Sequence, residues 1–356
     1  MEEILNFLSH AVENEASDLF IVSGLKLSAK IDGKIHSVGE DIVMPEKSNQ
    51  FVTELYQLAS RPMDSYIAKG DDDFSLSVKN LSRFRVSTYR QRGSMAAVIR
   101  VVRFGLPDFK ALGIPDEVLT VAKKTRGLLL VTGPAGNGKS TTLAYITDTI
   151  NSTRNAHIIT IEDPIEYLHR NKECVVSQRE INVDTESYLT ALRACLRQAP
   201  DVILLGEMRD LDTIRTAMTA AETGHLVIST LHTVGAVKTI DRIIDVFPEG
   251  QQQQIRIQLS MVLQTVISQQ LVPTEDGKLH PVFEIMHLNS AIRNMIRDSK
   301  IHQIDGIIQS SSSEGMISTD SSIFELYKNK IIKADTALKF AYNLEQMERR
   351  IAANKW

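Results

Sequence analysis

Residues 127–141 read Gly-Leu-Leu-Leu-Val-Thr-Gly-Pro-Ala-Gly-Asn-Gly-Lys-Ser-Thr. The first six residues form a short apolar run of the length of a buried strand, and a helical stretch follows the lysine. The segment from Gly133 to Ser140 matches the pattern GxxxxGK[ST], which between a strand and a helix is typical of a phosphate-binding loop. A glycine turn without function is the alternative. The strand and the helix on either side favour a nucleotide site.

The residue types of this loop suit an anion. Its glycines let the backbone approach a phosphate group closely, while Lys139 brings a positive charge to the outer oxygens and Ser140 offers a hydroxyl to Mg²⁺. The amides at the start of the following helix point to the same place. We therefore predict that ATP and Mg²⁺ bind here. The predicted contacts are Gly133, Pro134, Ala135, Gly136, Asn137, Gly138, Lys139, Ser140 and Thr141.

Short apolar runs alternate with helical stretches beyond the loop, and this alternation predicts an α/β fold with a largely parallel sheet. The runs are 127–132, 157–162, 201–206 and 226–231.

The chain after residue 248 is expected to be mainly helical. Short strands are predicted near 268–272 and 282–286, and the serine-rich stretch Gln309–Ser322 is predicted to be an exposed, mobile loop.

Acidic residues follow two of the predicted strands. Ligands of an open parallel sheet bind at the carboxyl ends of its strands, so Glu162, Glu166 and Glu207 are candidates to orient an attacking water or to hold Mg²⁺. Helix capping is the alternative for each of them. His225 and His232 bracket the strand 226–230 with side chains on opposite faces, which argues against a shared metal. Each is either a phosphate sensor or a structural histidine.

The first hundred residues have a different pattern. Helices are predicted near 2–14, 46–59 and 62–69, together with several strands, which makes residues 1–104 a small α+β domain. Glycines and prolines over 105–115 predict a linker, and residues 116–356 form the second domain.

A basic hairpin is predicted near the end of the first domain. Arg83 and Arg85 share one face of a strand whose other face carries Phe84 and Val86, and Arg100 belongs to the next strand. These arginines suit contact with nucleotide phosphates, and a solvated face is the alternative. The acidic run Asp71-Asp72-Asp73 just before the hairpin is predicted to be an exposed turn.

Composition limits the classes of protein. The 356 residues suit two domains, and the net charge of -4 argues against a general nucleic-acid binder. Cys174 and Cys195 are the only cysteines of the sequence, too few for a disulfide scaffold or a four-cysteine zinc module. The apolar runs are shorter than the ~20 residues of a membrane span, and acids stand at the N-terminus where a signal peptide needs positive charge. A cytoplasmic protein is expected.

Four sequence boxes together resemble those of the secretion-superfamily ATPases, over nearly the whole chain. They are 133–141, Thr160–Glu166, Leu205–Asp210 and Gly224–Thr233. Three further stretches are most similar to the PilT-type ATPases of type IV pilus retraction. These are 206–214, 239–248 and 291–297, where Met295 replaces the usual leucine of a helix tied to retraction.

The resemblance implies a PAS-like N-terminal domain and a RecA-like P-loop ATPase core that clamp ATP in a ring-shaped homohexamer. It implies hydrolysis of ATP that drives pilus retraction and twitching motility, at the cytoplasmic side of the inner membrane and through a platform protein there. The roles it implies are phosphate binding by Lys139, Mg²⁺ binding by Ser140 and Glu207, catalysis by Glu162, Glu166 as general base, His225 and His232, and nucleotide contact by Arg83, Arg85 and Arg100.

Two other readings remain open. An ATPase of a conjugation-like or type IVB secretion system would share the boxes. A regulator that senses ATP without hydrolysing it would not need the intact Glu162, Glu166 and Glu207. An assembly or type II secretion ATPase is disfavoured, because such proteins usually have a longer N-terminal region and a tetracysteine zinc module.

Overall fold

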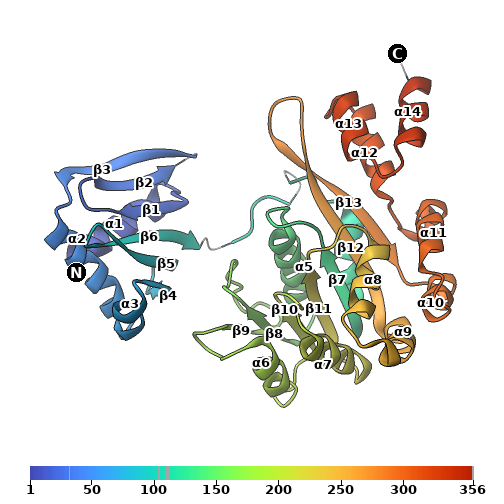
Figure 1. The fold of residues 1–356 in the computed structure, drawn as a ribbon, viewed down its shortest axis with the longest axis horizontal. Coiled ribbons are helices and arrows are strands. Elements are labelled where there is room, and N and C mark those ends of the chain that lie inside the picture. The colour runs from blue at the N-terminus through green and yellow to red at the C-terminus, as the bar shows by residue number, and fades with distance from the viewer. Residues whose placement is uncertain (32, 103–104, 110–111, 355–356) are drawn as a thin grey trace. The chain divides into compact units, whose positions relative to one another are not determined.

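The computed structural model describes residues 1–31, 33–102, 105–109 and 112–354. Residues 103–104 and 110–111, which belong to the predicted end of the first domain and to the predicted linker, lie outside this description. The chain divides into two compact units (Figure 1): Met1–Gly105, with which Glu166–Leu168 is grouped, and the remainder from Leu106 onward.

The first unit is α+β, as its pattern predicts. Its strands have the order β3-β2-β1-β6-β5-β4. Residues from α1 and α2, among them Ile4, Leu8 and Leu55, are fully buried in one core with Phe84 of the sheet. The elements are α1 (Glu2–Glu13), β1 (Asp18–Ile21), β2 (Lys26–Ile31), β3 (Lys34–Ile42), α2 (Pro45–Leu58), α3 (Asp64–Lys69), β4 (Asp71–Val78), β5 (Ser82–Gln91) and β6 (Ser94–Val102).

The predicted turn at Asp71–Asp73 is wrong, although Asp71 and Asp73 are exposed as expected. These residues begin β4, and Asp72 accepts hydrogen bonds from Arg61 Nε at 2.9 Å, from Arg61 Nη2 at 3.0 Å and from the hydroxyl of Tyr56 at 3.1 Å. The hydrogen bonds from Tyr56 and Arg61 thus stabilise the Asp72 carboxylate within a strand.

The second unit contains a seven-stranded sheet with the order β13-β12-β7-β11-β10-β8-β9 in the described residues. All neighbouring strands are parallel except β12 and β13, which form an antiparallel hairpin. The two short strands predicted after residue 248 are longer than expected, because each extends the other's pairing. The strands are β7 (Gly127–Thr132), β8 (His157–Glu162), β9 (Val175–Glu180), β10 (Val202–Leu205), β11 (Leu226–Leu231), β12 (Leu263–Pro273) and β13 (Leu279–His287).

Helices cover both faces of this sheet. Leu128 and Leu130 of β7 face one core with α6 to α9, while Leu129 and Val131 face a second core with α4 and α5. Each fully buried leucine contributes roughly 1.5–3 kcal/mol, so the sheet is fixed from both sides. The helices are α4 (Asp116–Thr120), α5 (Lys139–Thr153), α6 (Tyr188–Cys195), α7 (Leu211–Glu222), α8 (Ala236–Asp245) and α9 (Glu249–Val262).

The remaining helices follow the β12–β13 hairpin (Figure 1). In α10, Ile292 and Ile296 are buried and Met295 packs beside them, which confirms the predicted helix. α12 to α14 pack with Val272 and Val282 of the hairpin. No helix in the described ranges is both long and apolar enough to cross a bilayer. The helices are α10 (Ser290–Arg297), α11 (Ile304–Ser310), α12 (Thr319–Lys328), α13 (Ala334–Phe340) and α14 (Leu344–Ala353).

The predicted exposed loop at Gln309–Ser322 is also wrong. Ile317 exchanges two backbone hydrogen bonds with Ile285 of β13, and Ser318 caps α12. Asp320 is buried and accepts hydrogen bonds from the backbone amides of Tyr342 at 2.6 Å and Asn343 at 2.9 Å. Ser318 occupies the N-cap, a position that favours a small hydroxyl side chain, while Ser310 ends α11 and Ser321 and Ser322 lie within α12.

Candidate active site

The phosphate-binding loop is shaped by glycines at both ends. Gly133 has a φ of +140°, and a β-carbon there would lie 2.1 Å from the backbone oxygen of Gln269. Gly138 has a φ of +79° and caps α5 in the left-handed region, where a β-carbon would lie 2.9 Å from Gln269 Nε2. At Gly136, a β-carbon would meet no atom within 4 Å. The open side of the cradle therefore lies at Gly136 and not at the two ends.

Strand β12 holds this loop in shape. Gln269 is 3 % exposed, and its Oε1 accepts a hydrogen bond of 2.6 Å from the hydroxyl of Thr142 on α5. Asn137 Oδ1 accepts a hydrogen bond of 2.7 Å from the amide of Leu271. Sequence reasoning missed Gln269, because only the pairing of β12 with β7 brings it to the loop and no local pattern announces that pairing.

Lys139 is buried under the loop. Its ammonium donates hydrogen bonds to the backbone oxygens of Gly133 at 2.8 Å and Pro134 at 2.9 Å, and it lies 3.5 Å from Nδ1 of His232. The sheet order explains the last contact, since β11, which ends just before His232, is the neighbour of β7. The positive charge thus stands where the loop ends and the helix begins.

His232 connects Lys139 to Glu207. Its Nε2 lies 3.3 Å from Oε2 of Glu207, which follows β10, the next strand of the sheet. An ammonium only donates and a carboxylate only accepts, so the two contacts suit a ring that accepts at Nδ1 and donates at Nε2. Three neighbouring strands therefore place a cation, an imidazole and a carboxylate in one row.

Arg209 completes the surroundings of Glu207. Its Nη2 lies 2.7 Å from Oε1 of Glu207, whose side chain is 13 % exposed against 75 % for that of the arginine. The hydrogen bond to Glu207 raises the pKa of Arg209. Arg209 was not predicted as a site residue, because an arginine near the end of a strand is often only a solvated surface residue.

Glu162 ends β8 beside β10, so it stands one strand beyond Glu207. Its Oε1 accepts hydrogen bonds from Thr160 Oγ1 at 2.6 Å and from Gln178 Nε2 at 3.3 Å. Tyr188 lies near the same strand ends. Burial, with the negative charges of Glu207, Asp163 and Glu162, raises the pKa of Tyr188, so its phenol stays protonated at neutral pH.

The structure does not bring every predicted residue into this row. Glu166 is exposed, and among the described residues it makes no hydrogen bond or ion pair with Glu162, Glu207 or His232. His225 lies at the amino end of β11, where Nδ1 is 3.0 Å from the oxygen of Ala220. Within the chain, His225 stands at the far end of the strand that leads to His232.

The three predicted arginines share one face of the first unit. Arg83 and Arg85 alternate with buried residues of β5, as predicted, and Arg85 pairs directly with Arg100 of β6. Arg100 Nε lies 3.0 Å from Oδ1 of Asp18, and its side chain is 66 % exposed. The carboxylate of Asp18 is the buried partner of this ion pair, with 12 % of its side chain exposed.

The residues at the loop fit a magnesium nucleotide. Ser140 lies half-buried in the first turn of α5, and Glu207 supplies a carboxylate. Within the described ranges, His, Cys, Asp and Glu side chains form no group of three or more able to hold a metal by themselves. Mg²⁺ suits such a site, because it takes one or two protein ligands and fills its shell with phosphate oxygens and water.

Comparison with known proteins agrees with this arrangement. Residues 1–328 match the model of the type II/IV secretion system protein family. The type IV pilus retraction ATPase PilT of Pseudomonas aeruginosa is 41% identical over 94% of this chain and 97% of its own. A twitching motility protein of Neisseria gonorrhoeae is 43% identical over 88% of this chain and 85% of its own.

Solved structures show the same relationship. The crystal structure of the pilus retraction motor PilT with bound ADP has a TM-score of 0.89 and 42% identity, over 97% of this chain and 99% of that one. The ATPase DotB of Legionella pneumophila has a TM-score of 0.74 over 94% of both chains, and at 24% identity it shows a shared fold alone. The chain belongs to the type II/IV secretion system protein family, and within it to the group of PilT-type ATPases.

Proposed function

We propose that this protein is an ATPase motor that hydrolyses ATP to drive retraction of a type IV pilus. The observation that supports it best is the row formed by Lys139, His232 and Glu207 at the mouth of a glycine-shaped phosphate cradle. Relatives named for pilus retraction and twitching motility support pilus retraction as the process that this ATP hydrolysis drives.

The chain's own groups account for the chemistry. Lys139 and the amides at the start of α5 stabilise the negative charge of the phosphates. Ser140 and Glu207 would hold Mg²⁺, which would neutralise phosphate charge when bound. His232 keeps Glu207 in place through its Nε2 proton. Glu166, assisted by Glu162, orients the attacking water and accepts its proton.

The domain assignment and the arginines belong to the same proposal. Residues 1–104 form a PAS-like domain, 105–115 a linker, and 116–356 a RecA-like ATPase domain with a helical extension. Arg83, Arg85 and Arg100 are the proposed nucleotide contacts of the first unit, and their common face on β5 and β6 supports this role. The face that they share suits a triphosphate, since guanidinium groups bind phosphate oxygens in pairs.

The proposed assembly is a homohexamer at the cytoplasmic face of the inner membrane. A platform protein of the pilus machine would be its partner there, and nucleic acid would not. A ring fits a motor because its subunits pass through the same cycle at different times.

Two experiments test the function. Purified protein with Mg²⁺ and ATP should release phosphate steadily, and Glu166→Gln should lower the rate at least 100-fold while nucleotide binding persists. Absence of hydrolysis would reject the enzyme. A strain without the gene should lose twitching motility yet keep or accumulate surface pili, whereas loss of the pili would indicate an assembly motor.

A further inference from the structure

Strand β9 presents two polar side chains, those of Gln178 and Glu180, on one face beside the end of β8. Gln178 pairs in register with Thr160 and Glu180 with Glu162, so these side chains share a face of the sheet. The chain between the two strands carries Glu166. Side chains of β9 can therefore contact both Glu162, which ends β8, and the segment that carries Glu166.

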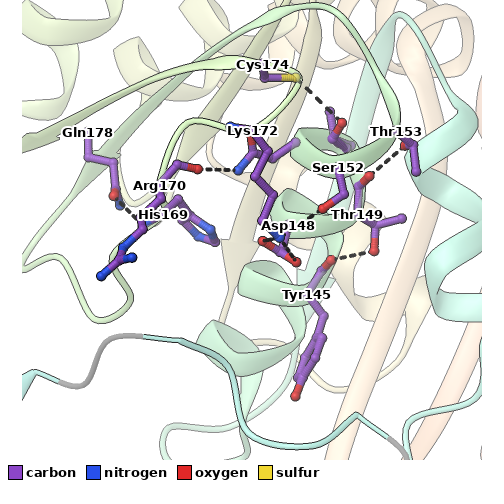
Figure 2. Close-up of polar contacts among 12 residues, drawn as sticks. Tyr145, Asp148, Thr149, Ser152, Thr153, His169, Arg170, Lys172, Cys174 and Gln178 are labelled. Carbon is purple, nitrogen blue, oxygen red and sulfur yellow. Dashed lines mark hydrogen bonds and ion pairs between the residues drawn. The ribbon is translucent and has the colours of Figure 1, made fainter.

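Gln178 and Glu180 hold the chain on either side of Glu166. Oε2 of Glu180 accepts a hydrogen bond of 3.0 Å from the amide of Ile165, and Oε1 of Gln178 accepts one of 2.8 Å from the amide of His169. Figure 2 shows Gln178 directed at this part of the chain. The amides of Ile165 and His169 are therefore both held by β9, and these two hydrogen bonds position the ends of the segment that carries Glu166.

The other end of the Gln178 amide reaches Glu162. Nε2 of Gln178 lies 3.3 Å from Oε1 of Glu162, the same oxygen that receives the hydroxyl of Thr160 at 2.6 Å. A backbone N–H only donates and a carboxylate only accepts, so the two contacts agree on one orientation of the amide. One side chain therefore joins the carboxylate that ends β8 to the end of the Glu166 segment.

The chain that continues past His169 is attached to α5. The ammonium of Lys172 lies 2.7 Å from Oδ1 of Asp148 (Figure 2). Nδ2 of Asn151 donates a hydrogen bond of 2.7 Å to the oxygen of Arg170. α5 begins at Lys139. The chain that follows the Glu166 segment is therefore bonded to the helix that begins at the phosphate-binding loop.

We propose that Gln178 is a positioning residue for hydrolysis, whose single amide sets the Glu162 carboxylate and the segment that carries Glu166. This rests on the proposed function, in which these two glutamates act on the attacking water. Displacing such a group by about 1 Å costs on the order of 100-fold in rate. Groups that act on the attacking water contribute in the transition state, so their displacement lowers kcat and not the affinity for ATP. Gln178 should therefore affect kcat and leave nucleotide affinity intact.

Three variants test the proposal in steady-state phosphate release, with nucleotide affinity and Tm measured in parallel. Gln178→Leu removes both hydrogen bonds. Gln178→Glu keeps an acceptor for the His169 amide but offers no hydrogen to Glu162. Both should lower kcat at least 10-fold with the Kd for ATP within about twofold of the parent chain. Val175→Thr, on the same strand and exposed, should match the parent.

The outcomes separate the two ideas. A parental kcat in Gln178→Glu overturns the positioning role, because holding the loop through His169 would then be enough. Loss confined to KM also overturns it. If Gln178→Leu does not fold, the nearly isosteric Gln178→Glu decides alone. Absence of hydrolysis in the parent chain rejects the proposed function and this inference with it, whereas the first two results reject the inference only.

Discussion

The Nε2 atom of His232 lies 3.3 Å from Oε2 of Glu207, across the carboxyl ends of the adjacent strands β11 and β10. Glu207 is the more buried partner, with 13 % of its side chain exposed against 54 % for the histidine. The imidazole thus orients a carboxylate that the surrounding protein largely shields. The other ring nitrogen, Nδ1, lies next to Lys139, so the imidazole of His232 contacts both the lysine of the phosphate-binding loop and Glu207.

Replacing His232 should therefore lower the rate of hydrolysis. In His232→Leu neither contact survives, and we expect kcat to fall roughly 10- to 100-fold, the range for loss of a residue that orients a metal-binding carboxylate. His232→Gln retains a donor for Glu207 and should lose less. Steady-state phosphate release measures both, with the exposed His36→Gln as control. Equal rates for all three variants would contradict a role for the ring.

Gly133→Ala should damage both the fold and the site. The added β-carbon would lie 2.1 Å from the Gln269 oxygen, at a φ of +140° that L side chains rarely adopt. Relief requires movement of β12 away from the loop. We expect a loss of about 2 kcal/mol or more in the free energy of unfolding, and loss of ATP binding.

Gly224→Ala is a matched control for that substitution. Its φ is also positive, at +109°, but no atom lies within 4 Å of the added carbon. It therefore carries the backbone strain without the collision. Thermal unfolding and fluorescent-nucleotide titration compare the two, and an equal fall in Tm would show that backbone strain alone is responsible.

Asp320→Ala should loosen the C-terminal helices. The buried carboxylate accepts the amides of Tyr342 and Asn343, which lead into α14. Removing it leaves two donors without their partner, which costs about 1–3 kcal/mol for each that stays buried. Limited proteolysis should then cut near residue 342 sooner than in the parent. The exposed Asp335→Ala should leave the cleavage pattern unchanged.

Glu284 gives the stability a pH dependence. It is buried in β13, and desolvation raises its pKa above the ordinary 4.5 despite hydrogen bonds from the Ala236 amide at 2.7 Å and the Thr319 hydroxyl at 3.1 Å. The folded state therefore binds this proton more tightly than the unfolded state. Its contribution to stability is present below the ordinary pKa and is lost as pH rises through the raised folded value.

Glu284→Gln lacks this titration. The Tm of the variant minus that of the parent should grow as pH rises from about 4 to 8, and thermal unfolding over that range measures it. The exposed Glu275→Gln should show no such trend. A difference that stays flat or shrinks with rising pH would mean that the buried carboxyl ionises without cost.

The sequence predicted features that arise from local patterns. Apolar runs identify every strand of the described sheet in the second unit except β9, whose sequence Val-Val-Ser-Gln-Arg-Glu is mostly polar. The alternation around Phe84 places Arg83 and Arg85 on one face, because strand periodicity is a local property of the sequence. The phosphate loop is equally local. The residues that were missed, such as Gln269 and Gln178, act across strands that pair only in the folded sheet.

The sequence predicted that His225 and His232 bracket a strand, and β11 lies between them as expected. Seven residues of extended chain span about 23 Å, so of these two histidines only His232 reaches Lys139 and Glu207. The errors at Asp72 and Asp320 have another cause. The acidic run suggested exposure at Asp72 and the serine-rich composition suggested it at Asp320, but partners distant in sequence bury both carboxylates with their hydrogen bonds satisfied.

The contacts between β12 and the phosphate loop have a consequence for biosynthesis. The Gln269 oxygen closes one side of the cradle at Gly133, and the Leu271 amide fixes Asn137. A nascent chain that has emerged only as far as α9 therefore contains the whole loop sequence without the strand that shapes it. Competence to bind ATP should appear on the ribosome only once residue 271 has left the exit tunnel.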